Sequence, residues 1–582
     1  CPICDQGGEC DLQDQAMAYG KGFSRFIENK RAVKDKNLGP LIKTHMTRCI
    51  HCTRCVRFAE EVAGVDQLGT VGRGEETEIT TFLEQAIDSE LSGNIIDLCP
   101  VGALTSKPYA YVARPWELKK TDSIDLMDAF GSNVRFDTKG DKIMRVLPRV
   151  NESINEEWIS DKTRFAYDGL LSQRLNSGYI LQGKKLIEVS NKDLVSLVTD
   201  KLKNSKKSKI GALIGNTLDC ETIFSFKKFL EKLGCANYDC RQDNSFFIPG
   251  DRSSYLFNTS ISGIEESDLC LLIGCNPRIE APILNSRLRR KYIESNNDFT
   301  IARVGEAADL SYRVNELGAS PTILTEILNN EHLFNKKLRK SKNPLFIIGQ
   351  GALCRKDSEE IFLTAKKIYE NFTKKNDWNG FNVLQTFSGR AGALDLNFYN
   401  PSKKLLKSSI IDRANNGEFD ILYLFAADEV DLESIPDSTF IIYHGHHGDY
   451  TAQRADIVIP TPCYTEKEGI YINIEGRPQI SAQIRNPLPN VNDAWKFFTM
   501  ILNKLNLDIG FTNYDELRNL MFEKHPHMKK IGNLSKVNNV KSKSINGKIM
   551  DVPLESNIKN FYMTDSVSRL SKVMAECSKK NL

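Results

Sequence analysis

The placement of cysteines constrains this chain more than any other feature of its sequence. Seven of its fifteen cysteines lie within the first 99 of 582 residues. They form one group of Cys1, Cys4 and Cys10, a second group of Cys49, Cys52 and Cys55, and a single Cys99 that is followed directly by proline. This layout is typical of chains that fold around iron–sulfur clusters.

The second group has the spacing of a [4Fe-4S] site. Three thiolates separated by two residues each bind one side of an iron–sulfur cube, and a remote cysteine followed by proline completes the ligand set. Zinc sites more often consist of two separated Cys-x-x-Cys pairs, because a tetrahedral ion takes two pairs rather than a triplet and a single residue. The sequence therefore predicts a [4Fe-4S] cluster on Cys49, Cys52, Cys55 and Cys99, with zinc as the alternative.

The first group offers three ligands and needs a fourth. The chain has no initiator methionine and its first residue, Cys1, is itself a candidate ligand, so we expect a fragment or a processed or split product whose missing ligand lies upstream. The alternative is that His45 or His51 supplies it. His51 lies between two cysteines of the second group, where a polar neighbour of that cluster is the more typical role.

Composition narrows the classes of function. The 78 basic and 75 acidic residues give a net charge of +3, so the chain has no overall field for binding nucleic acid. No segment has the 18 or more apolar residues of a membrane span, and runs such as Leu269–Ile273 are typical of buried strands. Ligand thiols must stay reduced until they bind metal, which indicates the cytosol or the mitochondrial matrix.

Beyond the cysteine-rich part, residues 1–112, the pattern changes twice. In residues 113–170 we expect a small β-rich module, since Asn133–Leu147 predicts two strands around a glycine turn. In residues 171–521, apolar runs end in glycine or polar residues and precede helical stretches such as Glu221–Leu233 and Pro282–Tyr292, which predicts one or two doubly wound α/β units. The runs are Lys209–Ile214, Leu269–Ile273, Leu345–Ile348, Ile421–Phe425, Phe440–Tyr443 and Ile457–Ile459. We expect the Lys-, Asn- and Ser-rich tail, residues 522–582, to be ordered only in part.

Other chemically active side chains are weaker candidates. His444, His446 and His447 end a predicted strand and can bind zinc, but without a cysteine or paired carboxylate at suitable spacing a simple loop is favoured. The same holds for His525 and His527. Cys240 is the one tempting ligand for a molybdenum centre, although a lone buried cysteine usually acts as a small hydrophobic residue. The remaining cysteines show no ligand spacing and are interpreted as structural: Cys220, Cys235, Cys270, Cys275, Cys354, Cys463 and Cys577.

Several motifs resemble one family over nearly the whole chain. The N-terminal motifs are CPICDQGGECDLQD at residues 1–14, TRCIHCTRCVR at 47–57 and DLCPVGAL at 97–104. Further motifs are EWISDKTRF at 157–165, GCNPRIEAP at 274–282, and EKEG at 466–469 with NIEGR at 473–477. They resemble the large iron–sulfur subunit of proton-pumping NADH:quinone oxidoreductase, respiratory complex I.

The resemblance implies a fold and a set of cofactors. It implies an α/β protein in which a ferredoxin-like iron–sulfur region precedes a doubly wound domain of the molybdopterin oxidoreductase type. One [4Fe-4S] cluster falls on Cys1, Cys4 and Cys10 with a histidine before residue 1, and the other on Cys49, Cys52, Cys55 and Cys99. A [2Fe-2S] cluster is expected only in an upstream domain that this chain lacks. Because residues 116–170 contain no cysteine, we expect no further cluster there and no molybdopterin in the α/β domain, which is then a scaffold.

The implied function is electron transfer within complex I. Single electrons pass from the NADH- and FMN-binding module through the clusters toward quinone, and this chain alone completes no reaction. The implied partners are other peripheral-arm subunits, including the FMN/NADH-binding subunit, with no nucleic acid and with attachment to the membrane through partners. The location is the matrix side of the mitochondrial inner membrane or the cytoplasmic face of a bacterial one. The alternatives are an electron-transfer subunit of NAD-linked formate dehydrogenase or hydrogenase, and a zinc-stabilised interaction protein.

Three arginines flank the second cysteine group. Arg48, Arg54 and Arg57 are placed to favour an added electron on a negatively charged cluster. They are equally suited to pair with acidic side chains on the surface. The sequence leaves these two roles open.

Overall fold

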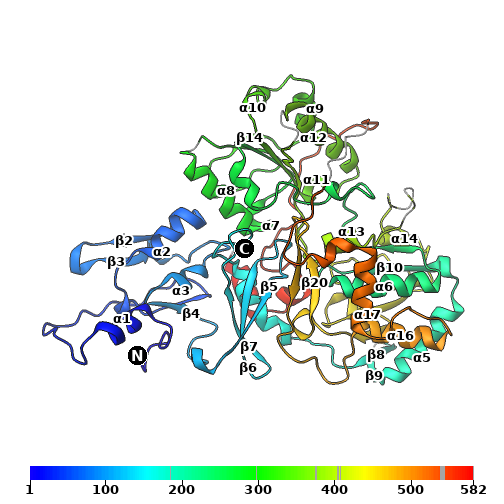
Figure 1. Cartoon of the computed structure of the whole chain (residues 1–582), viewed down its shortest axis with the longest axis horizontal. Helices are drawn as coiled ribbons and strands as arrows, with labels where there is room; N and C mark the ends of the chain where they lie inside the picture. Colours follow the sequence, from blue (N-terminus) through cyan, green and yellow to red (C-terminus); the bar gives the residue numbers. More distant parts are fainter. Residues whose placement is uncertain are drawn as a thin grey trace.

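The chain folds into an N-terminal region rich in loops, a central three-stranded sheet and two α/β lobes (Figure 1). The computed structural model describes residues 1–183, 185–296, 298–373, 377–400, 402, 406, 408–537 and 544–580. Within these residues, no helix combines the length and the apolar character that crossing a bilayer requires. The mixed α/β fold agrees with the class expected from the sequence.

The N-terminal region contains only short helices and strands. They are α1 (Asp11–Tyr19), β1 (Ile42–Thr44), α2 (Arg54–Arg57), β2 (Leu68–Val71), β3 (Glu78–Thr81), α3 (Asn94–Leu98) and β4 (Leu104–Ser106). Strands β1 and β4 pair antiparallel, with Thr44 opposite Leu104. This pairing brings the loop after β1, which holds the second cysteine group, beside the loop before β4, which holds Cys99. Gly69 lies in β2, and Gly72 and Gly74 follow it in the connection to β3, with which β2 pairs antiparallel.

The central sheet joins the N-terminal region to the lobes. Its strands are β5 (Lys119–Ile124), β6 (Asn133–Lys139) and β7 (Lys142–Pro148), all antiparallel. The expected turn is present at Gly140, whose φ of +61° is a conformation that glycine adopts without strain. Two acidic residues after β5, Asp125 and Asp128, are buried against Lys162 of α4 (Asp161–Phe165), and burial raises the pKa of Asp125 to about 8.

The larger lobe is built on seven described strands in the order β11-β10-β17-β18-β19-β8-β9. Their bounds are β8 Gly178–Gln182, β9 Lys185–Val189, β10 Ile210–Ile214, β11 Asn237–Asp239, β17 Ile421–Phe425, β18 Phe440–Gly445 and β19 Ile457–Pro460. Strands β10, β11, β17, β18 and β19 run parallel, whereas β8 and β9 form an antiparallel edge. The helices α5 (Asn191–Asn204), α6 (Cys220–Leu233) and α16 (Ala494–Lys504) share one core with the inward-facing residues of one sheet face. Helix α14 (Ile410–Asn415) packs with residues of the other face.

The smaller lobe is inserted between β11 and β17 of the larger one. Its parallel sheet has the order β14-β13-β12-β15-β16, with bounds Asn315–Gly318, Thr300–Val304, Leu269–Ile273, Pro344–Ile348 and Phe381–Val383. Alternate residues of β12 enter different cores. Leu271 packs with α9 (Thr322–Leu328) and α12 (Ser358–Phe372), while Leu272 packs on the side of α8 (Pro282–Glu294). The apolar runs and both helical stretches expected from the sequence are therefore present, in two doubly wound units.

The C-terminal segment returns to the N-terminal half of the chain. It includes α17 (Tyr514–Lys524), α18 (Ser566–Arg569) and α19 (Lys572–Lys580). The sequence predicts only partial order here, but in residues 544–580 the scattered apolar side chains of Leu554, Phe561, Val567 and Met574 are buried. Much of this segment is irregular, so its apolar residues have no helical or strand period that a sequence pattern can reveal.

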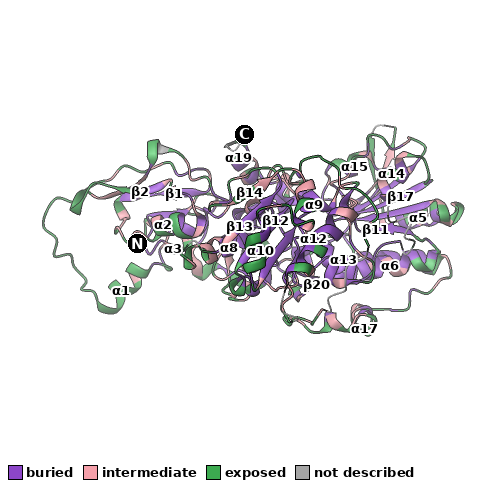
Figure 2. Ribbon diagram, turned by 90° about the horizontal axis from the view of Figure 1, so that it is seen from above, coloured by how far each residue is buried: buried purple, intermediate pink, exposed green. Residues whose placement is uncertain are grey.

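The extent of burial differs between the two ends of the molecule. Figure 2 shows buried residues filling the strands of both lobes and exposed residues along α1 and the loop that follows it. Exposed apolar side chains are concentrated on this N-terminal segment: Ile3, Leu12, Met17, Tyr19, Phe23, Phe26 and Ile27.

Candidate iron–sulfur sites

Cys49, Cys52, Cys55 and Cys99 line a single pocket. Cys49 ends the turn Met46–Arg48, Cys55 lies in α2, and Cys99 follows α3. On either side of Cys52 the chain adopts the left-handed conformation, with φ of +54° at His51 and +59° at Thr53. Such φ values are costly for residues other than glycine and are found where a functional geometry demands them.

The rest of this pocket is largely apolar. It is lined by Met46, Ile50, Ile79, Val101 and Ala103 among others. Cys55 and Cys99 are buried, whereas Cys52 is exposed. A shell of this kind limits the access of water to the sulfur atoms and lowers the local dielectric constant, both of which influence the redox potential of a bound cluster.

The pKa values of these thiols are shifted by burial and by one another. Burial raises the pKa of Cys55 to about 12, and the nearby sulfurs of Cys99, Cys49 and Cys52 contribute to the same shift. Burial also raises the pKa of Cys99, while backbone N–H groups of Val101, Ala103 and Leu104 oppose the shift. The raised pKa values of Cys55 and Cys99 favour their protonated forms, and a metal cluster displaces such protons when it binds.

The first cysteine group lies against the loop that carries Cys99. The Sγ of Cys10 donates a hydrogen bond to the carbonyl oxygen of Pro100 at 3.5 Å. A Cβ atom added to Gly102 would lie only 2.2 Å from the Sγ of Cys4. The structure thus brings Cys4 and Cys10 to residues 99–102, whereas Cys1 is exposed.

The two histidines considered as a fourth ligand for this group have other partners. Both ring nitrogens of His45 are engaged, Nδ1 with Asp35 at 3.5 Å and Nε2 with the hydroxyl of Tyr111 at 3.2 Å. The backbone N–H of His51 donates to the Sγ of Cys49 at 3.4 Å, so His51 belongs to the second group.

The three flanking arginines differ in their contacts. Arg48 donates to the carbonyl oxygen of Ile3 at 3.0 Å and to that of Gly102 at 3.4 Å, so it connects the loops of both groups. Arg54 lines the pocket of the second group and lies 3.4 Å from a carboxylate oxygen of Asp11. Arg57 pairs with Glu61 at 2.9 Å on the surface. Sequence order alone does not distinguish these roles.

The remaining histidines and Cys240 have defined surroundings. His444 is buried in β18, its Nδ1 lies 3.0 Å from the hydroxyl of Tyr423, and burial lowers its pKa to about 3. The Nε2 of His527 lies 2.9 Å from a carboxylate oxygen of Asp395. Cys240 is buried, and burial raises its pKa to about 12.

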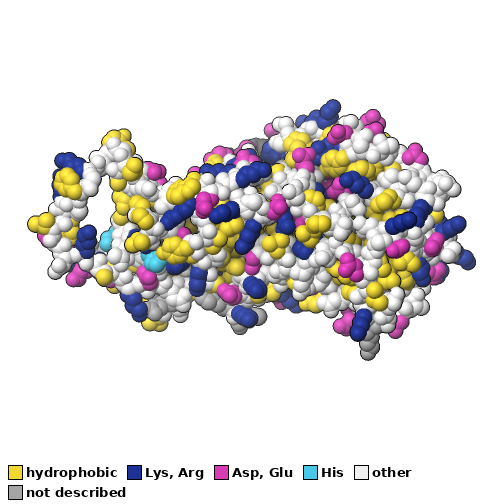
Figure 3. Space-filling model, turned by 90° about the horizontal axis from the view of Figure 1, so that it is seen from below, with side chains coloured by type: hydrophobic (Ala, Val, Ile, Leu, Met, Phe, Trp, Pro, Cys, Tyr) yellow, Lys and Arg dark blue, Asp and Glu magenta, His cyan; other side chains and the backbone are white. Residues whose placement is uncertain are grey.

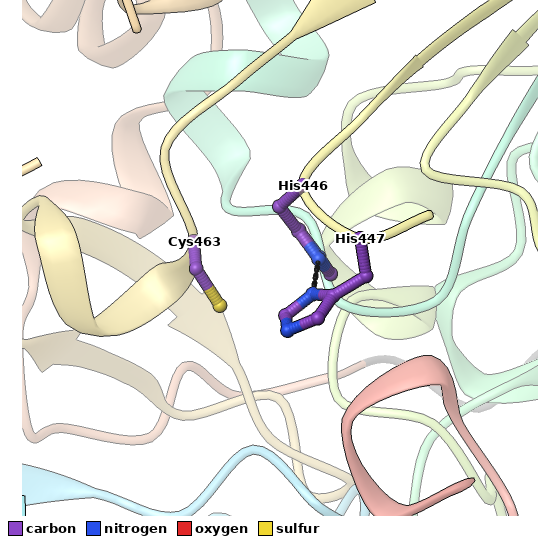
Figure 4. A group of neighbouring side chains, drawn as sticks. All are labelled: His446, His447 and Cys463. Carbon is purple, nitrogen blue, oxygen red and sulfur yellow. Dashed lines mark hydrogen bonds between the residues drawn. The ribbon is translucent and has the colours of Figure 1, made fainter. Parts of the chain in front are cut away.

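One grouping is not evident from the sequence. Cys463, whose spacing favours a structural role, returns beside His446 and His447, with its sulfur directed toward the two rings (Figure 4). The histidine run contains no cysteine of its own. Cys463 lies sixteen residues after His447, in another loop, so the local spacing of residues does not reveal this group.

Comparison with known proteins assigns the family. This chain is 45% identical to the G subunit of NADH-quinone oxidoreductase of Rickettsia bellii over 99% of its own length and 83% of that protein. It is also 45% identical to the NADH-ubiquinone oxidoreductase 75 kDa subunit of Reclinomonas americana, over 99% of its length and 85% of that protein. This chain belongs to the 75 kDa subunit family of NADH-quinone oxidoreductase. A mitochondrial member, NADH dehydrogenase [ubiquinone] iron-sulfur protein 1 of Solanum tuberosum, is 43% identical over 99% of this chain and 77% of its own.

Five protein-family models match successive segments of this chain. Residues 1–25 match the NADH-ubiquinone oxidoreductase-G iron-sulfur binding region, and residues 39–105 match the NADH-quinone oxidoreductase subunit 3 ferredoxin-like domain. Residues 118–168 match the NDSU1/NuoG-like 4Fe-4S domain, 174–504 match molybdopterin oxidoreductase, and 530–577 match the C-terminal region of the G subunit of NADH-ubiquinone oxidoreductase. Because residues 118–168 contain no cysteine, no thiolate ligand is available in that region. Among solved structures, acetylene hydratase from Pelobacter acetylenicus gives a TM-score of 0.47 over 72% of this chain and 74% of its own, at 12% identity.

Proposed function

We propose that this chain is the electron-transfer subunit of an NADH-quinone oxidoreductase and carries two [4Fe-4S] clusters. The second cluster is held by Cys49, Cys52, Cys55 and Cys99. The first is held by Cys1, Cys4 and Cys10, with a histidine before residue 1 as the fourth ligand in the pattern of the family. The observation that carries the proposal is the convergence of four cysteines, three of them close in sequence and one remote, on one largely apolar pocket.

The spacing of the sulfurs supports a cluster over a single zinc ion. Four sulfurs bound to one tetrahedral zinc lie about 3.8 Å apart, because each zinc–sulfur bond is about 2.3 Å long. Within the part of the chain that the structure describes, these cysteines do not form a group whose ligand atoms all lie within 4.8 Å of one another. The ligands of an iron–sulfur cube are held further apart, since each binds a different iron.

When bound, such clusters accept and donate single electrons without chemistry on a substrate. The residues of this chain hold and surround them. The apolar lining of the second site limits the access of water to Cys55 and Cys99, and Arg54 places a positive charge at its rim. The chain thereby sets the position and the potential of each site, which is the protein's part in electron transfer.

The contacts between the two sites support a relay. The side-chain amide of Gln6, between Cys4 and Cys10, donates to the carbonyl oxygen of Cys99 at 2.9 Å. Together with the hydrogen bond from Cys10 to Pro100, this contact places the ligand loops of the two sites against each other without an intervening layer. A short separation of this kind is what single-electron transfer between two sites requires.

Partner subunits, in this proposal, include the one that binds NADH and FMN, and they hold the chain at the membrane. Support comes from the exposed apolar side chains at the N-terminal end, such as Met17, Phe23 and Ile27. Figure 3 shows hydrophobic side chains gathered at that end of the molecule. An apolar surface beside the cluster sites is suited to subunits that exchange electrons with them. The corresponding locations are the matrix side of the mitochondrial inner membrane and the cytoplasmic face of a bacterial membrane.

The α/β lobes, in this proposal, form a scaffold without molybdopterin. Cys240, the candidate ligand for a molybdenum centre, lies between Asp239 and Arg241, which pair with each other at 2.6 Å. Metal analysis separates this proposal from a formate dehydrogenase, which requires molybdenum.

Electron paramagnetic resonance of the dithionite-reduced, purified complex tests the cluster assignment. We expect two [4Fe-4S] signals that depend on this chain, and iron and sulfide in matching amounts. A colourless chain that contains zinc in place of iron and sulfide would contradict the proposal.

A further inference from the structure

We propose that His446, His447 and Cys463 form a buried zinc site in the larger lobe, separate from the iron–sulfur sites. One ligand atom from each of the three side chains lies within 4.8 Å of the others. All three residues are buried, with exposed fractions of 4%, 0% and 0%. Imidazole nitrogen and thiolate sulfur together suit zinc better than calcium or magnesium, which prefer oxygen ligands.

The hydrogen bonds of His447 are those of a metal-binding histidine. Its Nε2 lies 3.2 Å from the carbonyl oxygen of Gly169, which can only accept a hydrogen bond, so Nε2 carries the proton. The Nδ1 atom of the neutral ring therefore presents a lone pair. Metal-binding histidines usually donate their other ring N–H to a carbonyl or a carboxylate in this way.

The lone pair of His447 faces the second imidazole. The Nδ1 atoms of His446 and His447 lie 2.5 Å apart, and the two ring planes are nearly perpendicular, at 88° (Figure 4). In the metal-free chain they share one proton. When zinc binds, that proton moves to Nε2 of His446, so that both rings bind as neutral imidazoles. The two Nδ1 atoms then separate to about 3.3 Å, the distance between two ligands in a tetrahedron with zinc–nitrogen bonds of about 2.0 Å.

Cys463 is placed to bind as a thiolate. It precedes the short turn Tyr464–Glu466, in which the backbone N–H of Glu466 donates to the carbonyl oxygen of Cys463 at 2.9 Å. The turn directs the sulfur toward the two imidazole rings (Figure 4), and the thiol releases its proton when it binds the metal. The thiolate also cancels one of the two positive charges of zinc.

Neighbouring cations do not prevent a metal from binding here, because each has an anionic partner. Arg174 forms a salt bridge with Glu466 and also donates to the carbonyl oxygen of His446. Lys467 forms a salt bridge with Asp219. The positive charges near the site are thus balanced by buried carboxylates, and the site itself contributes a thiolate.

The elements that meet at this site point to a structural role. His446 and His447 follow β18, Cys463 follows β19, and Gly169 lies in the segment that connects the central sheet to the larger lobe. A zinc ion bound here joins two loops of the larger lobe, and the hydrogen bond from His447 connects them to that segment. The three side chains leave the fourth tetrahedral position of the ion to a water molecule. Because the ligands are buried and come from two different loops, we assign the ion to stability and not to catalysis.

Zinc analysis of the full chain tests this inference independently of the proposed function. The chain is purified without oxygen, incubated with zinc sulfate and desalted, and its zinc and iron are measured by mass spectrometry. We expect one zinc per wild-type chain, retained in Cys270→Ala and lost in Cys463→Ala, with iron unchanged in all three. Cys270 is the matched control because it is an equally buried thiol, in β12 of the other lobe.

Absorption spectroscopy at the zinc edge keeps the inference falsifiable if Cys463→Ala does not fold. For the wild-type chain we expect one sulfur at about 2.3 Å and nitrogen ligands at about 2.0 to 2.1 Å. A wild-type chain that retains no zinc, or zinc with no sulfur neighbour, overturns the proposal. Equal zinc content in wild type and a folded Cys463→Ala variant overturns it as well.

Discussion

The sulfur of Cys4 occupies the space that a side chain at Gly102 would need, since a Cβ there would lie 2.2 Å from it. Residue 102 is therefore required to be glycine for a steric reason, because no positive φ is involved. The absence of a side chain lets a ligand of the first site approach the loop of the second. The two sites are thus coupled by packing as well as by hydrogen bonds.

Replacing Gly102 by alanine is expected to disturb the first site more than the second. The added methyl group must displace Cys4 or its loop, so we expect the paramagnetic signal of the first cluster to weaken or broaden. The measurement is resonance spectroscopy of the reduced protein, with Gly69→Ala as the control because nothing lies within 4 Å of a Cβ there. Identical spectra for wild type and Gly102→Ala would show that the contact is unimportant.

Removal of one ligand from the second site is expected to remove its cluster. In Cys52→Ala we expect a loss of about four iron atoms per chain and of the second signal, since one corner of the cube has no thiolate. The larger lobe should still fold, because its cores contain no residue of this pocket. Circular dichroism and iron analysis measure both effects, with Cys354→Ala as the control. Full iron content in Cys52→Ala would refute the ligand assignment.

We expect substitutions of Arg54 and Arg57 to change the reduction potential of the second cluster by different amounts. Arg54 lines the pocket of the second site, whereas Arg57 is paired with Glu61 on the surface. In Arg54→Glu, a positive charge becomes negative near the cluster, so the potential of the second site should fall by on the order of tens of millivolts. In Arg57→Glu the change should be much smaller, because Arg57 is not among the residues that line the pocket and solvent screens its exposed side chain. Redox titration of both variants measures the shifts, and equal shifts would show that position at the rim is irrelevant.

The buried carboxylate of Asp395 predicts a loss of stability in acid. Burial acts to raise the pKa of Asp395, but hydrogen bonds and charge from His527 and Arg252 outweigh it and lower the pKa to about 2 from the ordinary 3.8. A lowered carboxyl pKa stabilises the folded state above the unfolded pKa, and this stabilisation is lost as the pH falls from about 4 to about 2. At neutral pH the contribution is about 2 kcal/mol.

The variant Asp395→Asn tests that contribution. Its urea midpoint should lie below that of wild type at pH 7, and the difference should shrink as the pH approaches 2. The exposed Asp437, which pairs with Arg454, provides the control, because Asp437→Asn should change the midpoint little at any pH. A difference for Asp395→Asn that does not depend on pH would rule out its charge as the cause.

Some strands can be predicted because their burial produces a continuous run of apolar residues. Strand β17, Ile421–Phe425, is apolar throughout since both of its faces are covered, and its bounds match the prediction. The edge hairpin β8–β9 is not evident from the sequence. Its strands, Gly178–Gln182 and Lys185–Val189, are largely exposed or half-buried, so they lack a continuous apolar run.

The same distinction applies to the candidate sites. The ligand spacing of Cys49, Cys52 and Cys55 is local and can be read directly from the sequence. The position of Cys463 beside the histidines depends on the parallel pairing of β18 with β19, which no short motif encodes. The connection that Arg48 makes between the two cysteine groups likewise depends on how two loops fold together.

The C-terminal segment packs against the first part of the chain, which affects the order in which the core between them can form. Ser571 donates to a carboxylate oxygen of Asp168 across 403 residues, and Tyr562 and Met574 share a core with Ile95 and Phe165. The cysteine loops leave the ribosome long before the residues that close this core are made. The core around Ile95 and Phe165 is therefore complete only after Tyr562 and Met574 have been made.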